Sequence, residues 1–301
     1  MKNAIEYFYN FPSITIIEHK DKITFSINKN EYHLVINKRD YRELEDLYNL
    51  TESWYNCYKI IRNKNNSLIT NINNKEYILL QVNRDYKREI GIKDLLFTPN
   101  INIELYPSLK RNNWSALLQK KIDFFIYQRE HIRKKYLIID EVLDYYIGMT
   151  ENAISYLNET LSTKKLQVDK NISISHKRIK QNIVYDIYNP LNIVIDHKAR
   201  DISEYLKLIF INNEIESKRD VINKLLMNIN FNEYDYKLLI ARMMYPSFFF
   251  DKYEEIINET NREEDILPIV RRMKDYEIYI KYIYNTIFRK IKIPKIEWIF
   301  K

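Results

Sequence analysis

The sequence predicts a two-lobed α+β protein in which a small antiparallel sheet lobe precedes a larger helical lobe. Short β-branched and aromatic runs fill residues 12–82, whereas apolar residues from Trp114 onward recur at helical spacing. The chain has 301 residues, 46% of them hydrophobic, which is enough for one large or two modest cores. We therefore expect an N-terminal sheet lobe with one helix at 1–85 and a mainly helical C-terminal lobe at 86–301.

The N-terminal lobe is expected to contain a meander, one helix and a second hairpin. The predicted strands are Phe11–His19, Lys22–Asn28, Glu31–Asn37, Ser67–Ile72 and Lys75–Val82. Asp40 suits a helix cap, and the apolar spacing after it predicts a helix as far as about Arg62. Asn73 and Asn74 lie between the last two runs and predict the turn of the hairpin.

The C-terminal lobe is expected to be helical with a small pair of strands in its middle. Apolar residues at i, i+3 and i+4 offsets predict one amphipathic helix over 114–126 and another over 140–161. Short apolar runs within 171–195 suit small strands, and helices resume at about Ile202.

Glycine is scarce, and this excludes a class of phosphate sites. Gly91 and Gly148 are the only two glycines, where average usage of roughly 7% would give about 20. Neither G-x-x-x-x-G-K-S/T nor G-x-G-x-x-G occurs. A glycine-rich loop that wraps its backbone N–H groups around a phosphate is therefore not expected.

Charge and cysteine usage favour an ordinary globular protein. Lys and Arg number 48 against 41 Asp and Glu, giving +7, but the two signs alternate along most segments, which favours solvated faces over a nucleic-acid site. The single cysteine, Cys57, excludes an internal disulfide and indicates a reducing cytoplasm. The sequence shows no signal peptide and no membrane span, so neither nucleic acid nor a membrane is expected as a partner.

A small sheet with one helix, followed by a helical lobe with a hairpin in its middle, resembles the kinase-like fold. Such enzymes need a loop over the phosphates, a strand lysine pinned by a helix glutamate, and an acidic catalytic loop. The first predicted turn, at Lys20-Asp21, lacks glycine, and Val35 stands at the expected lysine position. Glu43 or Glu45 would be the helix glutamate, and we interpret either as a solvent-facing residue.

The segment around His176 resembles the H-G-D-x-x-x-x-N loop of aminoglycoside-phosphotransferase-like and choline-kinase-like enzymes. His176 matches, but Arg178 stands where those enzymes carry the catalytic aspartate, and Asn182 falls one residue early. Asp196, in Ile193-Val194-Ile195-Asp196-His197, resembles their metal-binding aspartate. Because a guanidinium stays protonated, Arg178 cannot act as a general base. We expect no catalytic residues, and we interpret the loop as vestigial.

Further segments resemble the spore coat kinase-like proteins of endospore-forming Firmicutes, the CotS/YutH group and particularly its YutH branch. They are DYYIGMTENAISYL (144–157), RDISEYL (200–206), ARMMYPSFFFD (241–251) and IPKIEWI (293–299). The resemblance implies a pseudokinase of the aminoglycoside phosphotransferase-like fold. It also implies a role in coat assembly with other spore coat proteins as partners, first in the mother-cell cytoplasm and then in the coat.

Two alternatives and one residual metal site stay open at this stage. An active small-molecule phosphotransferase would use ATP and magnesium with a displaced base such as Asp186 or Asp201; otherwise no cofactor is expected. Asp196 could still hold a divalent cation, since hard cations favour carboxylate oxygen. A nucleic-acid-binding protein is the third interpretation and would show strongly salt-dependent binding.

Overall fold

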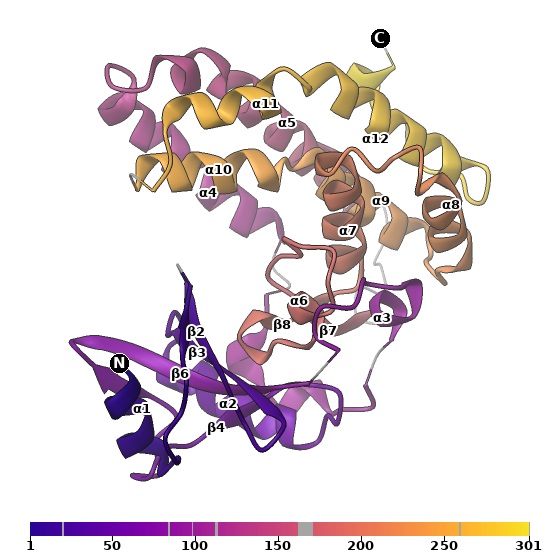
Figure 1. Cartoon of the computed structure of the whole chain (residues 1–301). Coiled ribbons are helices and arrows are strands. Elements are labelled where there is room, and N and C mark those ends of the chain that lie inside the picture. Colours follow the sequence, from indigo (N-terminus) through magenta and orange to yellow (C-terminus); the bar gives the residue numbers. More distant parts are fainter. Residues whose placement is uncertain are drawn as a thin grey trace. The chain divides into compact units, whose positions relative to one another are not determined.

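The computed structural model of the chain describes residues 1–19, 21–83, 85–97, 99–111, 114–161, 171–258 and 260–300 (Figure 1). Lys20, in the first predicted turn, lies outside these residues. Packing divides the chain into two compact units, Met1–Lys110 with Ser173–Asp196, and Arg111–Ile172 with His197–Lys301. The lobe boundary expected after residue 85 falls inside the first unit and stays a prediction.

The first unit is built on an antiparallel sheet with the strand order β1-β2-β3-β6-β4, and β5 pairs with β6. Its strands are β1 (Ile17–Glu18), β2 (Lys22–Ile27), β3 (Asn30–Ile36), β4 (Lys59–Ile61), β5 (Thr70–Ile72) and β6 (Lys75–Val82). Its helices are α1 (Lys2–Tyr9), α2 (Tyr41–Glu52), α3 (Ile92–Leu96) and α6 (Tyr185–Tyr188), with 3-10 turns η1 (Ile103–Leu105), η2 (Pro107–Leu109) and η3 (Pro190–Asn192).

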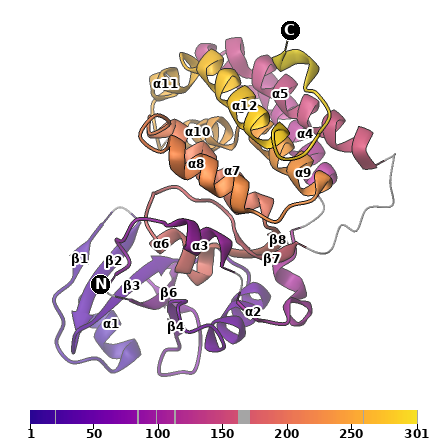
Figure 2. The same cartoon turned by 90° about the vertical axis from the view of Figure 1, so that its right-hand side faces the viewer.

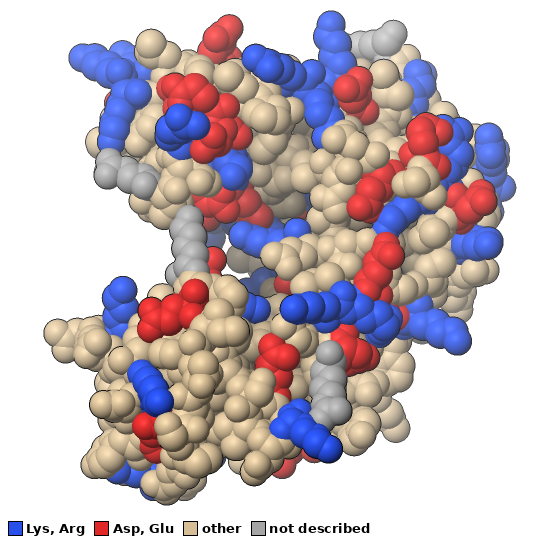
Figure 3. Space-filling model, viewed as in Figure 1, with Lys and Arg blue, Asp and Glu red and all other residues tan. Residues whose placement is uncertain are grey.

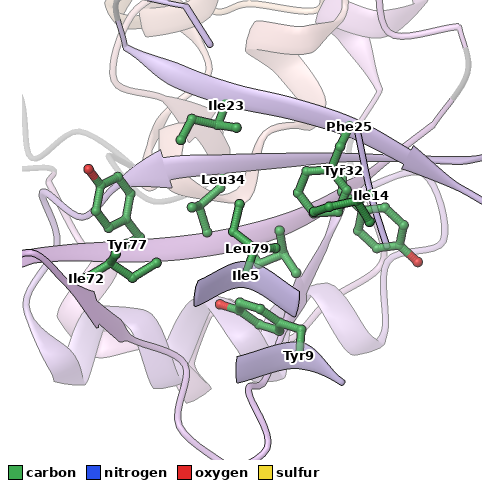
Figure 4. Close-up of a cluster of buried hydrophobic side chains, with 10 residues drawn as sticks. All are labelled: Ile5, Tyr9, Ile14, Ile23, Phe25, Tyr32, Leu34, Ile72, Tyr77 and Leu79. Atoms are coloured by element: carbon green, nitrogen blue, oxygen red, sulfur yellow. The ribbon is translucent and has the colours of Figure 1, made fainter. Parts of the chain in front are cut away.

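One face of this sheet is closed by α1. Side chains alternate along a strand, so Leu34 and Leu79 share a face and pack with Ile5 and Tyr9 of the helix (Figure 4). The hydroxyl groups of Tyr9 and Thr70 lie 2.8 Å apart, so the buried tyrosine hydroxyl has a hydrogen-bond partner. Helix α1 was not predicted from the sequence, and the strand predicted at 11–19 is reduced to Ile17–Glu18.

The helix that begins after Asp40 is shorter than predicted. The Asp40 side chain accepts the N–H of Glu43 at 2.8 Å, so the cap is confirmed. The helix ends at Glu52 rather than near Arg62, and Lys59–Ile61 forms β4. The backbone N–H of Tyr58 donates to the carbonyl of Tyr188 at 2.9 Å, a contact that a continued helix could not make.

The second unit is mainly helical and begins with long helices. Its helices are α4 (Trp114–Ile132), α5 (Leu137–Leu161), α7 (Ala199–Ile211), α8 (Arg219–Asn228), α9 (Glu233–Met244), α10 (Ser247–Ile257), α11 (Leu267–Val270) and α12 (Met273–Phe288), with 3-10 turns η4 (Glu263–Ile266) and η5 (Glu297–Ile299). α9 contacts α5, α7 and α12 (Figures 1 and 2), and every residue from Tyr234 to Met244 is buried. A helix buried all round marks the centre of this unit.

The short strands expected in the helical half are present as a two-stranded sheet. They are β7 (Ile172–His176) and β8 (Ile193–His197). The predicted fold class, a sheet lobe with a helical lobe, is confirmed. No helix among the described residues is long and apolar enough to cross a membrane.

Charged side chains of both signs alternate over the described residues on the face drawn in Figure 3. The surplus of +7 is therefore not gathered into a single basic patch on that face. This distribution agrees with the interpretation of the charges as solvated faces.

Candidate functional site

The residues of the candidate catalytic loop lie on one hairpin, between β7 and β8. The N–H of Lys177 donates to the carbonyl of Asn192 at 2.7 Å and closes the base of the loop. His176 ends β7 with 4% of its surface exposed, and Asp196 in β8 is fully buried. The structure thus places His176, Asp196 and the loop residues together in the first unit, while their roles stay predictions.

The backbone of Arg178 is held by the side chain of Asn192. Its N–H donates to Oδ1 of Asn192 at 3.2 Å, and its carbonyl accepts from Nδ2 at 2.6 Å. The same Nδ2 donates to the carbonyl of Asp186 at 2.7 Å. The guanidinium group donates to the carbonyl of Lys177 at 3.0 Å. The cationic side chain of Arg178 is therefore held in the loop, and its match to the position of the catalytic aspartate stays a prediction.

Asp186, one of the displaced bases considered above, shapes the turn of the loop. Its Oδ2 accepts the N–H groups of Lys180 at 2.7 Å and Gln181 at 2.9 Å. Burial raises the pKa of Asp186, although these two N–H groups and the nearby His176 oppose the shift. The carboxylate oxygen with two backbone partners stabilises the loop conformation.

Asn182 fastens the loop to the segment that follows β6. Its Nδ2 donates to Oε1 of Glu89 at 2.5 Å, and Glu89 pairs with Ile183 as an isolated antiparallel bridge. The N–H of Val184 donates to the carbonyl of Arg88 at 2.8 Å. The amide nitrogen of Asn182 thus has a structural partner inside the first unit.

The second face of the sheet carries a cluster of aromatic rings around His33. The ring centroid of His33 lies 5.2 Å from that of Tyr86 and 5.3 Å from that of Tyr185, and Tyr185 lies 5.6 Å from Tyr58. Val35 is two residues from His33 on β3 and shares this face. The face of β3 that carries His33 is therefore lined by aromatic side chains at this residue.

His33 is neutral at physiological pH because of its surroundings. It is fully buried, and burial lowers its pKa to about 4. Its Nε2 lies 3.1 Å from Oε1 of Glu31, a contact that opposes the shift without cancelling it. The imidazole therefore packs as an aromatic ring and supplies no positive charge.

The helix glutamate has a partner, which corrects the expectation that Glu43 faces solvent. Glu43 is 7% exposed, and its Oε2 lies 2.9 Å from Nη1 of Arg39. Arg39 also donates to the carbonyls of Leu191 at 2.9 Å and Ile193 at 2.5 Å. Glu45 pairs with Arg62 at 3.0 Å. The partner of Glu43 is thus Arg39, which follows β3. The same guanidinium group also donates to backbone carbonyls at and just before the start of β8.

The described residues contain no cluster of side chains that could bind a metal ion. No group of three or more His, Cys, Asp or Glu side chains could hold an ion there. Asp201 is buried in the first turn of α7. Burial lowers the pKa of Lys198 to about 8, and the negative charge of Asp201 opposes this shift.

Arg39, Asn192 and the ring of Tyr185 were not predicted from the sequence, because their partners are distant in sequence.

The chain matches a family model across residues 2–282, and the description of that family is "Spore coat putative kinase YutH". It is also 25% identical over 211 residues to the "Endospore coat-associated protein YutH" of Bacillus subtilis (strain 168). That match covers 62% of this chain and 61% of the relative, so less than two thirds of the relative's length is spanned.

Solved structures with a similar fold are phosphotransferases. Spectinomycin phosphotransferase APH(9)-Ia, in complex with ADP and spectinomycin, aligns with a TM-score of 0.58 at 11% identity over 95% of this chain and 97% of its own. An aminoglycoside phosphotransferase from Alicyclobacillus acidocaldarius gives 0.58 at 8% identity over 96% of each chain. Amicoumacin kinase hAmiN gives 0.54 at 12% identity over 94% and 92%. These likenesses show the aminoglycoside-phosphotransferase-like fold.

Proposed function

The chain belongs to the spore coat YutH family and has a kinase-like fold, and from this premise we propose that it is a catalytically inactive pseudokinase that takes part in spore coat assembly. The family fixes neither the absence of catalysis nor the role in the coat. Both parts of the proposal rest on the residues of this chain and on the printed description of its relative.

The observation that carries the inactive state is Arg178 with its fixed backbone. A general base must accept a proton, which a guanidinium cannot do at physiological pH. Loss of a positioned base typically costs 10²–10⁴-fold in rate. Because the two hydrogen bonds from Asn192 hold the Arg178 backbone, the loop has a defined conformation that presents the wrong charge.

Two further features support the same proposal. β3 carries His33 and Val35 on the relevant face and no lysine, and aromatic rings of Tyr86 and Tyr185 pack there. Groups of one catalytic constellation act together, so simultaneous losses argue for no useful phosphotransfer rather than for a slow enzyme. We accordingly propose no cofactor, and we interpret Asp196 as a vestige of a metal site.

Nucleotide binding and turnover test this part. We expect ATP with magnesium to leave the thermal unfolding of the purified chain unchanged and to be neither hydrolysed nor used on small alcohols or amines. A ligand at a hundredfold excess over its Kd would stabilise the native state by about 2.7 kcal/mol, which is easily seen. Nucleotide-induced stabilisation together with phosphotransfer would overturn the proposal.

The second part, coat assembly, draws on the printed name of the relative, a coat-associated protein. We propose that this chain forms in the mother-cell cytoplasm, moves to the coat and has other coat proteins as partners. A fluorescent fusion followed through sporulation should form a ring at the spore periphery. A signal that stays diffuse, with no chain in extracted coat protein, would contradict the proposal.

A further inference from the structure

A groove of about 770 Å³ opens in the first unit beside β1 and β2. Its lining residues come from the segment before β1, from β2 and β3, from the segment after β6 and from the loop between β7 and β8. All of them belong to the first unit. The volume lies within the range of about 300–1,000 Å³ typical of small-molecule sites.

Two lysines of this groove lie close to the ring of Tyr86. Nζ of Lys22 is 5.8 Å and Nζ of Lys87 is 5.3 Å from its centroid. Burial lowers the pKa of Lys22, Glu31 opposes this and the charge of Lys87 adds to it, so the two ammonium groups repel each other. Among the described lining residues Glu31 is the carboxylate beside these two lysines, and Asp186 outside the lining also acts on Lys22.

The rest of the lining is rich in hydroxyl groups. The lining includes Ser13, Thr15, Thr24 and Ser26, and the Thr24 hydroxyl lies 3.2 Å from Nε2 of His19. Hydroxyl groups donate to and accept from the hydroxyl groups of a polar ligand. Ile14 and Phe25 are the buried apolar part of the lining.

We propose that this groove binds a small hydroxylated phosphate ester, with its phosphate between Lys22 and Lys87 and its hydroxylated body against Thr24 and Ser26. A dianion between the ammonium groups replaces their repulsion by two attractions. Lysine recognises phosphate as a point charge, and the described lining residues include Lys22 and Lys87. This inference rests on the groove and its charges and does not depend on the absence of catalysis.

Titration calorimetry with glycerol 3-phosphate tests the proposal, with glycerol and inorganic phosphate as the two fragments and ATP with magnesium as a separate arm. We expect glycerol 3-phosphate to bind more tightly than either fragment and ATP not to bind. The double variant Lys22→Met/Lys87→Met should weaken binding at least about tenfold, equivalent to about 1.4 kcal/mol. The matched variant Lys38→Met/Lys75→Met loses the same charge at exposed positions outside the groove and should change affinity less than about twofold.

A measurement on the unaltered chain protects the test against a misfolded variant. In amide NMR spectra, glycerol 3-phosphate should shift the signals of Thr24, Ser26 and Lys87. Failure of the native chain to bind it at millimolar concentration, shifts confined to other residues, or equal loss in both double variants would overturn the inference. Binding of ATP without binding of glycerol 3-phosphate would overturn this inference, whereas the proposed function is overturned separately, by phosphotransfer from ATP. Binding of glycerol 3-phosphate without binding of ATP supports the inference.

Discussion

Nη1 of Arg39 lies 2.9 Å from Oε2 of Glu43, and the same guanidinium group donates to the carbonyls of Leu191 and Ile193. This one side chain ties the start of α2 to the segment that leads into β8. In an active kinase a strand lysine is the partner of the helix glutamate and reaches the phosphates. Here the glutamate pairs with an arginine whose Nε and Nη2 donate to backbone carbonyls.

Replacing Arg39 by Met should destabilise the first unit strongly. The change leaves the Glu43 carboxylate, 7% exposed, without the guanidinium, and it removes a donor from two carbonyls. Breaking a buried ion pair typically costs about 3–5 kcal/mol. Urea denaturation should show this loss. The matched change Arg62→Met breaks the half-exposed pair with Glu45 and should cost about 0–1 kcal/mol. Equal costs for the two variants would contradict the role given to Arg39.

His33 should make stability depend on pH between about 6.5 and 4. Its pKa is about 4 in the folded chain, against 6.5 ordinarily, so the unfolded chain binds more protons in this window. Stability is therefore lost as the pH falls, by about 3 kcal/mol in all. His33→Gln removes this contribution, so the stability difference between native chain and variant should change by that amount across the window.

The control for this pH dependence is His131→Gln, at an exposed position on α4. Its stability curve should run parallel to that of the native chain. Urea denaturation at half-unit pH intervals measures all three proteins. A His33→Gln curve parallel to the other two would show that the buried imidazole does not set the slope.

Asn192 should hold the loop closed through its side-chain amide. Asn192→Ala removes the acceptor of the Arg178 N–H and the donor to the carbonyls of Arg178 and Asp186. Leaving such part-buried groups without partners should lower the free energy of unfolding by about 1–3 kcal/mol. Hydrogen exchange of the Arg178 amide should quicken accordingly. Asn152→Ala, at an exposed position on α5, should change stability by less than about 0.5 kcal/mol. Unchanged exchange in the first variant would remove the amide from this role.

Placing a carboxylate at position 178 should not produce phosphotransfer. Arg178→Asp supplies a proton acceptor, yet β3 still presents Val35 and His33 in place of a lysine. Because catalytic groups act together, one group alone yields little rate. ATP consumption by Arg178→Asp should equal that of Arg178→Asn, which has the same size without the charge. Consumption by the aspartate variant alone would mean that the base was the one missing part.

The sequence predicted the elements whose signals are local. Asn73 and Asn74 were expected to form a turn, and both have positive φ, of 50° and 60°, between β5 and β6. Asn tolerates the left-handed region because its short polar side chain bonds locally. The Asp40 cap is local in the same sense. Such features depend on three or four residues, which the sequence displays directly.

The elements that were wrong depend on distant partners. The helical spacing of Trp54 and Tyr58 suggested a longer helix, but Tyr58 pairs with Tyr188, 130 positions away, and belongs to a different segment. Glu43 was interpreted as solvent-facing because its partner, Arg39, is held in place by the carbonyls of Leu191 and Ile193. These two residues are about 150 positions away, so the sequence does not display the contact. Residue type gave the chemistry of the candidate loop, whereas the contacts that fix its shape come from the tertiary structure.

Lys29→Gly should stabilise the chain. Asn28 and Lys29 connect β2 to β3 with φ of 48° and 71°. The backbone of Lys29 is therefore in the left-handed region, which a residue with a Cβ atom rarely adopts. That region costs most L-residues about 1–2 kcal/mol, whereas glycine adopts it freely. Glycine also makes the unfolded chain more flexible, which offsets part of this gain, so the free energy of unfolding should rise by about 0.5–1 kcal/mol. The same replacement at Lys75, which begins β6, should instead destabilise by about 0.5–1 kcal/mol, since strand glycine brings the entropy cost without relieving strain. Thermal unfolding of both variants decides it, and a loss of stability in Lys29→Gly would show that contacts of the lysine side chain outweigh the backbone strain.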